Sequence, residues 1–274
     1  MQAILITAYK NQDYLKKLIR FFSVKYKVYV HLDKKSKIQK ESLLLNKNVT
    51  VIKKYVVNWG GLNHLLAILD LLEMALSDKQ VKYIHIISGQ DIPVKPLTDF
   101  NNFEGDDSIY MECNNVDDIK NPKIKWRYTI GTLFPNMDNR KKWIQIINSF
   151  HNIGNRKNKI DKFVDIYKGL VWCSFPASDC EYILKYCNNG KFIQEWKRIT
   201  IPEEFFFQTI LKNSKFSSKI KNNNLRYNDW HYRNGSEPAF LDVTDIKKIE
   251  SENCFFARKI DPETSVKLIE KYLI

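Results

Sequence analysis

The fold is decided by residues 88–97, SGQDIPVKPL, which directly follow the apolar run YIHII at residues 83–87. A short run rich in isoleucine that ends at a turn is typical of a buried strand. Pro93 and Pro96 keep a helix from starting at once, so the polar turn 88–91 is placed at the carboxyl end of that strand. Ligands of open α/β sheets bind at such strand ends, and we expect a binding site here.

The residues before this stretch alternate between strand and helix patterns. Apolar residues at helical spacing predict a helix over 12–24 and another over 63–76, for which Asn63 is a candidate N-cap. Strands are expected at residues 3–9, 26–32, 49–52, 81–87 and 108–113. This β-α-β rhythm predicts an α/β fold with a twisted, mainly parallel sheet and helices on both of its faces.

The second half of the chain is less regular. Strands are expected at 170–174 and 225–231, with a basic loop at 154–159. Helices are expected at residues 143–153, 178–187, 202–211, 244–251 and 262–273. The helix at 202–211 opens with Pro202 followed by two acids, which suits a helix start. Neither a repeat nor a low-complexity linker is present, so we expect one domain over residues 1–274.

The chain carries a formal net charge of +13 over 274 residues. Its lysines are spread widely, with local clusters only at residues 140–142 and 156–162. Zinc-finger spacing and RNA-binding signatures are absent from the sequence, so we expect no nucleic-acid partner. A weak attraction to an anionic membrane surface is the alternative to a plain solvated surface.

The five cysteines include no C-x-x-C pair, which favours free thiols in a reducing compartment. No apolar run approaches the roughly 20 residues of a membrane span. The sequence starts with a short strand pattern and lacks the basic region of a signal peptide. These features predict a cytoplasmic protein, peripheral at the inner face of the membrane if the charge acts there.

A series of short motifs resembles glycosyltransferase family 14, the core-2/I-branching β-1,6-N-acetylglucosaminyltransferases and peptide xylosyltransferases. The matching segments, in the family's order, are residues 4–6, 9–11, 30–36, 57–61, 87–93, 172–173, 202–204, 206–207, 225–230 and 256–259. The resemblance implies a GT-A-like fold, a UDP-sugar donor, inversion at the anomeric carbon and independence of metal. It also implies that residues 1–113 mainly bind the donor nucleotide and that 114–274 carry the acceptor and catalytic half. Within the family, the chain looks like a bacterial member.

The acidic residues of the sequence agree with independence of metal. A metal-dependent transferase needs a D-x-D motif just after a strand, to link the ion to the diphosphate. The adjacent acids Asp106-Asp107 and Asp117-Asp118 do not have this spacing. We therefore expect neither a metal site nor a cofactor, and we expect fixed cations to neutralise the departing diphosphate.

An inverting transfer needs one base for the acceptor hydroxyl and a partner for the leaving diphosphate. The resemblance assigns the base to Glu204, while the residues alone also allow an acidic helix start. Phenylalanines at 205–207 would desolvate this carboxylate and raise its pKa. For the diphosphate, the family's lysine corresponds to Lys259, next to Arg258; an ordinary basic pair is the alternative.

An arginine that many relatives carry upstream is replaced here by Ala239. Arg226, Arg233 and Arg258 are the candidates to substitute for it, and Arg226 and Arg258 are therefore included with Lys259 in the predicted diphosphate site. Asp33, at the end of the second strand, is predicted to bind the nucleoside, with a simple turn aspartate as the alternative.

The sugars are assigned to a further set of residues. Asp91 in the polar turn is predicted to anchor a donor or acceptor hydroxyl, although it could simply cap the turn. Aromatic faces stack on pyranose rings, and the resemblance places Trp230 and Tyr232 around the acceptor. The same resemblance adds Lys125 and Trp126 from the irregular middle of the chain.

The resemblance thus implies an inverting, metal-independent glycosyltransferase, and we expect it to act on a glycan or lipid-linked glycan in bacterial surface polysaccharide synthesis. N-acetylglucosamine is the first expectation for the donor sugar and xylose the second. Two alternatives stay open. One is a metal-dependent nucleotidyltransferase-like enzyme on a similar sheet, and the other is a non-catalytic module that binds a nucleotide or sugar, to which Ala239 gives some weight.

Overall fold

The computed structural model describes residues 1–129, 131–151, 160, 163 and 165–273. In this part of the chain, seven strands form the main sheet in the order β10-β6-β9-β4-β1-β2-β3. Their bounds are β1 Gln2–Ala8, β2 Lys27–Leu32, β3 Val49–Ile52, β4 Tyr83–Ser88, β6 Ile109–Tyr110, β9 Ser174–Pro176 and β10 Ile220–Lys221. Strands β3, β2, β1 and β4 are all parallel, and β9 runs antiparallel to both β4 and β6. The prediction of a mainly parallel sheet is confirmed.

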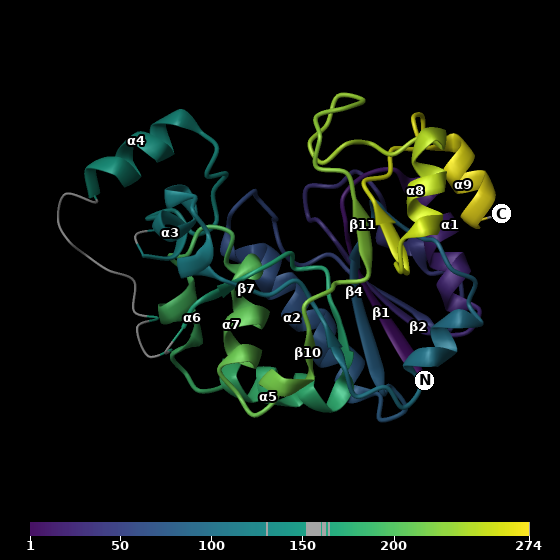
Figure 1. Cartoon of the computed structure of the whole chain (residues 1–274), viewed down its shortest axis with the longest axis horizontal. Helices are drawn as coiled ribbons and strands as arrows, with labels where there is room; N and C mark the ends of the chain where they lie inside the picture. Colours follow the sequence, from purple (N-terminus) through teal and green to yellow (C-terminus); the bar gives the residue numbers. More distant parts are fainter. Residues whose placement is uncertain (130, 152–159, 161–162, 164, 274) are drawn as a thin grey trace.

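Helices cover both faces of this sheet (Figure 1). Their bounds are α1 Gln12–Ser23, α2 Leu62–Ser77, α3 Pro122–Thr129, α4 Lys142–His151, α5 Ala177–Cys187, α6 Phe192–Trp196, α7 Phe206–Lys212, α8 Ile246–Ser251 and α9 Val266–Leu273. Helices α2, α5 and α7 lie on one side, while α1, α8 and α9 lie on the other. The mixed α/β class predicted from the sequence is therefore the class observed.

The alternation of side chains along β1 divides the core in two. Ala3 and Leu5 belong to the cluster that packs against α2, and Ile4 and Ile6 to the cluster that packs against α1. Successive side chains of a strand point to opposite faces, so a run that is apolar at every position is buried on both sides. The same pattern in β4 explains why the sequence around residues 83–87 indicates a central strand.

The polar turn after β4 leads into a second, small sheet. Asp91–Pro93 forms β5, which pairs antiparallel with β12 (Phe256–Arg258), and β12 pairs with β11 (Arg226–Asn228). A Cβ added at Gly89 would lie 2.8 Å from the Cβ of Ala8, so only glycine fits between β1 and the turn. The sequence indicated the turn correctly but not the strand that follows it, because three residues are too short for a periodicity.

Several boundaries differ from the sequence-based expectations. The strand expected at 170–174 is β9, Ser174–Pro176, and helix α2 is preceded by Gly61 instead of being capped by Asn63. The helix expected at 202–211 is divided into a 3-10 turn at Pro202–Glu204 and α7. This division places Glu204 in the 3-10 turn, outside the regular helix.

Some expectations cannot be compared with the structure in full. The loop at 154–159 and the end of the helix expected at 143–153 lie outside the described residues, as does the basic cluster at 156–162 apart from Ile160. A short two-stranded sheet joins β7 (Asn114–Asn115) to β8 (Tyr167–Lys168). Among the described residues, none of the helices combines the length and apolar character needed to cross a bilayer.

Candidate active site

A cavity of about 640 Å³ lies where three parallel strands of the main sheet end. Tyr9 follows β1, Asp33 follows β2 and Gln90 follows β4, and all three side chains line it. Carboxyl ends of parallel strands meet at one edge of a sheet, and loops leave that edge without backbone pairing, so a hollow forms there. The cavity thus lies at the strand ends where the sequence predicts a binding site, and Gln90 is the residue of the turn 88–91 that lines it.

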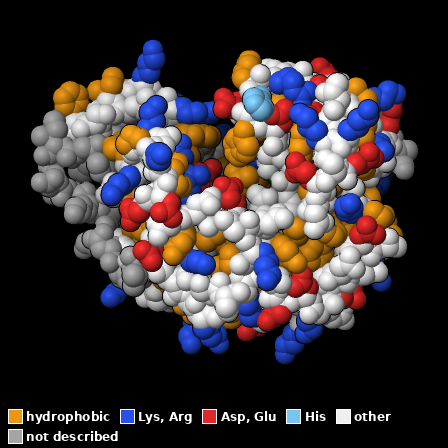
Figure 2. Space-filling model, viewed as in Figure 1, with side chains coloured by type: hydrophobic (Ala, Val, Ile, Leu, Met, Phe, Trp, Pro, Cys, Tyr) orange, Lys and Arg blue, Asp and Glu red, His pale blue; other side chains and the backbone are white. Residues whose placement is uncertain are grey.

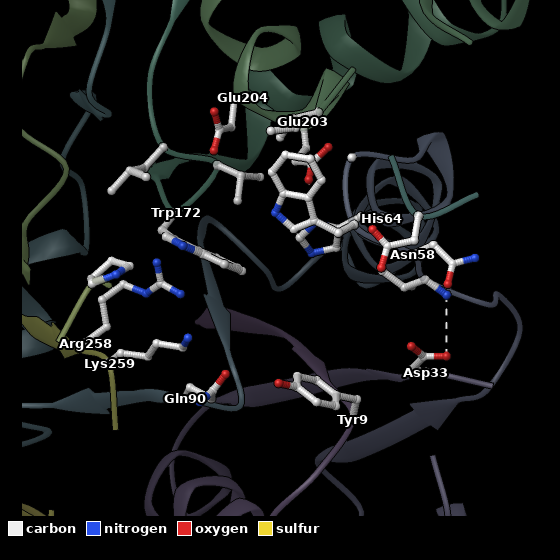
Figure 3. A pocket seen from close by; sticks show the side chains of 18 of the residues that line it. Tyr9, Asp33, Asn58, His64, Gln90, Trp172, Glu203, Glu204, Arg258 and Lys259 are labelled. Carbon is white, nitrogen blue, oxygen red and sulfur yellow. Dashed lines mark hydrogen bonds and ion pairs between the residues drawn. The ribbon is translucent and has the colours of Figure 1, made fainter. Parts of the chain in front are cut away.

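The opposite wall of the cavity is built by the second half of the chain. Figure 3 shows Glu204 on one side, Trp172 in the middle, and Arg258 and Lys259 together near Gln90. Asp33 and Asn58 lie at the other end. Of the predicted site residues, those that line the cavity are Asp33, Glu204, Trp230, Arg258 and Lys259.

Glu204 is held between two cations. Its Oε2 lies 3.0 Å from the Nζ of Lys168 and 3.6 Å from an Nη of Arg127. Burial raises the pKa of Glu204 above that of an exposed glutamate, and Lys168 lowers it by a smaller amount. The carboxylate therefore combines a raised proton affinity with a fixed position on the cavity wall.

The neighbouring acid, Glu203, has a different partner. Its Oε1 lies 2.9 Å from Nδ1 of His64, and Nε2 of the same ring lies 3.2 Å from Oγ1 of Thr7. This chain of contacts links the 3-10 turn to α2 and to the end of β1. Glu203 also lines the cavity, but it is buried and its Oε1 is paired with His64, so the two adjacent acids have different partners.

The guanidinium of Arg258 is oriented by the carboxylate of Asp91 and the indole of Trp172. Its Nε lies 3.3 Å from Oδ1 of Asp91, and its guanidinium carbon lies 4.8 Å from the ring centroid of Trp172. Burial lowers the pKa of Arg258, whereas Asp91 and Glu204 oppose that change. A guanidinium stays protonated throughout the working range of pH, so it is a permanent positive charge at the cavity.

Lys259 adds a second cation next to Arg258. Its Nζ donates to Oγ of Ser236 at 3.2 Å and lies 5.2 Å from the ring centroid of Phe240. The Nζ of Lys10 lies 5.6 Å from the same ring. Burial, with the charges of Arg258 and Lys10, lowers the pKa of Lys259. Arg258 and Lys259 thus place two neighbouring cations at the cavity, an arrangement that an anion would stabilise.

The other two arginines considered as substitutes are engaged elsewhere. Arg226 is buried and donates to the carbonyl oxygens of Ile86, Cys173 and Asn224 and to Ser174 Oγ, and it does not line the cavity. Arg233 lies among three carboxylates, those of Asp229, Asp242 and Asp245, at 2.5–3.2 Å. Among the candidates for the missing arginine, Arg258 is the one that the structure brings into the cavity.

Asp33 lies at the opposite end of the cavity from these cations. Its Oδ1 accepts from the backbone N–H of Lys35 at 2.9 Å, and its Oδ2 lies 3.7 Å from Lys35 Nζ. That ammonium also donates to the carbonyl of Val57 and to Asn58. Asp33 is therefore both a turn residue and a lining residue, as its position after β2 suggested.

The remaining predicted residues lie outside the cavity lining. Asp91 is fully buried, where its carboxylate accepts from the backbone N–H and hydroxyl of Ser88 and faces Arg258. Tyr232 is 74% exposed, although Trp230, two residues earlier, does line the cavity. Lys125 lies 3.6 Å from Asp117 on the exposed side of α3, and Trp126 is half-buried on the same helix. The structure does not bring these side chains to the cavity.

Sequence reasoning missed several residues that the structure places here. Lys168 contacts Glu204, His64 contacts Glu203, and the charge of Lys10 acts on Lys259. Each comes from a different element, so spacing along the chain carries no signal for their meeting. A weak signal exists for Lys10, which directly follows the first strand and precedes the first helix.

Among the residues that the structure describes, no group of three or more histidine, cysteine, aspartate or glutamate side chains is arranged to hold an ion. The described cysteines are free, and four of the five are buried.

Comparison with known proteins gives a consistent result. The chain is 24% identical to "Xylosyltransferase sqv-6" of Caenorhabditis elegans over 88% of its length, and 23% identical to "Xylosyltransferase oxt" of Drosophila melanogaster over 85%. It is 24% identical to "Xylosyltransferase 1" of Mus musculus over 79%. The chain spans only 32%, 28% and 22% of these relatives.

The family model described as "Branch: Core-2/I-Branching enzyme" matches residues 3–253. This range contains β1, β2 and β4, whose ends form one side of the cavity, together with Glu204 and Trp172 on the other side. The family expected from the motifs is therefore confirmed, and the chain belongs to the Core-2/I-branching enzyme family.

Proposed function

We propose that the chain is an inverting glycosyltransferase that moves a sugar from a UDP-sugar to a hydroxyl of a glycan or lipid-linked glycan, in the synthesis of a surface polysaccharide. One observation carries the proposal: Glu204 lines the same cavity as Arg258 and Lys259. A base and a cationic clamp on facing walls are the two groups that a single displacement requires. The position of the cavity, at the carboxyl ends of the parallel strands, also suits a GT-A-like fold.

The acceptor hydroxyl is activated by Glu204. Both of its ion pairs among the described residues use Oε2, so we assign proton transfer to Oε1. As the acceptor oxygen bonds to the anomeric carbon, its proton passes to Glu204 and the bond from that carbon to the diphosphate oxygen breaks. The electron pair of that bond leaves with UDP, and one inversion results.

The departing diphosphate is stabilised by fixed cations. Arg258 and Lys259 face the cavity, and Lys10 lies close to Lys259. Charge that develops on the leaving oxygen is stabilised most by groups already held in place, because they need no reorganisation during the reaction. Trp172 and Asp91 hold the guanidinium of Arg258, so we treat Asp91 as a positioning residue for the clamp.

The substrates are assigned along the length of the cavity. The nucleoside lies at Asp33, in the half formed by residues 1–113, and the diphosphate at Lys259. The acceptor enters past Trp230, whose ring is 54% exposed and can stack on a pyranose. Tyr232, Lys125 and Trp126 remain candidates for an acceptor that extends beyond the cavity. Because the relatives are named xylosyltransferases, a donor screen should test UDP-xylose alongside UDP-N-acetylglucosamine.

The test compares two adjacent glutamates. Glu204→Gln keeps the size of the side chain but removes the base, and we expect UDP release from a donor and an acceptor panel to fall about 10²–10⁴-fold. Glu203→Gln is the matched control and should retain most of the rate, because Glu203 faces His64. Equal rates for wild type and Glu204→Gln would contradict the proposal, and no turnover with any donor would favour a binding module.

A further inference from the structure

Helix α4 presents an unusual face to its surroundings. Its exposed side chains include Trp143, Ile146, Ile147 and Phe150, and Phe150 is 70% exposed. In Figure 1 the helix stands at the upper left, away from the main sheet, and Figure 2 shows orange and blue side chains gathered on that upper left edge. Single exposed apolar residues are common, but four on one short helix call for a partner.

The orientation of α4 is fixed by a narrow packed stripe on its other side. Ile144 and Asn148 are buried, and Asn148 accepts from the N–H of Leu133 at 3.0 Å. Ile146 and Phe150 come two residues after these, about 200° around the helix. The packed stripe therefore directs the apolar face outward.

The charges around this face favour an anionic partner. The sequence from residue 139 to 160 contains no aspartate or glutamate, and the helix starts at Lys141-Lys142, both exposed. Lys142 is four residues from Ile146, so it borders the apolar face. Basic residues beside an exposed Trp, Ile and Phe surface are typical of helices that lie in the interface of an anionic bilayer.

The place of α4 relative to the cavity supports the same partner. Asp138 and Arg140, just before the helix, line the cavity, and Asn139 donates to the carbonyl of Gly60 at 3.3 Å. The guanidinium carbon of Arg140 lies 5.7 Å from the ring centroid of Trp59, which is itself 42% exposed. A surface bound to α4 is therefore next to the cavity mouth.

We infer that α4 is a membrane-docking helix: its face of Trp143, Ile146, Ile147 and Phe150 inserts into an anionic lipid surface while Lys141 and Lys142 meet the headgroups. Long lysine side chains can bury their stems and keep their charge at the headgroup level. This docking does not depend on the chemistry in the cavity. It brings the cavity mouth to the level at which a lipid-linked substrate presents its sugar.

The experiment measures co-sedimentation of the full chain with vesicles of phosphatidylcholine, with and without phosphatidylglycerol. We expect binding to the anionic vesicles that weakens as salt rises. The double variant with Ile146→Asn and Phe150→Ser should reduce the ratio of vesicle-bound to free protein at least about tenfold. Val24→Ser/Leu44→Ser, which changes two exposed apolar residues elsewhere, is the matched control and should bind like wild type.

Other results would overturn the inference. It is wrong if the chain does not bind anionic vesicles, or if the Ile146 and Phe150 variant binds as well as wild type. Light scattering of the vesicle-free protein identifies a second copy as the occupant if a dimer is seen and the double variant abolishes it. Circular dichroism spectra and transfer to a water-soluble acceptor should be unchanged in the variant, so failure of docking is distinguished from failure of the enzyme.

Discussion

At Glu204, burial and the neighbouring cations act on the proton affinity in opposite directions. Burial raises the pKa above the 4.5 of an isolated glutamate, and Lys168 and Arg127 lower it. At Lys259, burial and its cationic neighbours lower the pKa below 10.5. The proposed mechanism needs Glu204 deprotonated and Lys259 protonated, so these two pKa shifts narrow the pH range of activity from both sides.

A pH profile of the transfer rate tests these assignments. The rate should fall as pH drops through the raised pKa of Glu204 and fall again as pH rises through the lowered pKa of Lys259. Lys168→Met removes the nearest cation to Glu204, so its pKa should rise and the acid limb should move to higher pH. An acid limb that stays in place in Lys168→Met would show that a different group titrates.

The residues predicted from strand ends and from the family resemblance reach the cavity in part. Asp33, Glu204, Trp230, Arg258 and Lys259 were predicted, and all five line it. Arg226 was misleading, because an arginine beside an apolar strand can equally be buried and bound to backbone carbonyls, as it is here. Lys168 and His64 could not be predicted, since their meeting with the glutamates depends on how distant elements pack.

At the level of elements, the β4–β5 connection joins the main sheet to the small sheet that carries Arg258. The backbone N–H of Gly89 donates to the carbonyl of Thr7 at 2.8 Å, and the turn therefore lies directly on β1. Sequence patterns predicted the long strands and α2 well, because their apolar residues are numerous and periodic. The strands of two or three residues in the small sheet were missed, since pairing rather than local pattern creates them.

A small substitution tests the importance of this connection. Gly89→Ala places a Cβ 2.8 Å from that of Ala8, and we expect the free energy of unfolding to fall by about 1–3 kcal/mol in urea titrations, with weaker UDP binding. Gly105→Ala is the comparison: its added Cβ meets nothing within 4 Å, although its positive φ carries some strain. If Gly105→Ala also weakened UDP binding, the weaker binding of Gly89→Ala could not be attributed to the contact between this turn and β1.

For the molecule as a whole, segments far apart in sequence line one cavity. The ends of β1, β2 and β4 supply Tyr9, Asp33 and Gln90, and the residues after position 200 supply Glu204 and the cations. The order of motifs indicated this arrangement, because residues separated along the chain can share a sheet edge. The exposed face of α4 was not foreseen, since its periodicity alone is that of a helix packed on a core.

The most direct test of the central claim is calorimetric titration of UDP in the presence of EDTA. We expect wild type to bind, and Lys259→Met to bind at least about tenfold more weakly, because fixed cations hold the diphosphate. Lys271→Met, at an exposed lysine of α9, should bind like wild type. UDP binding that requires a divalent ion, or that is unchanged in Lys259→Met, would contradict the account.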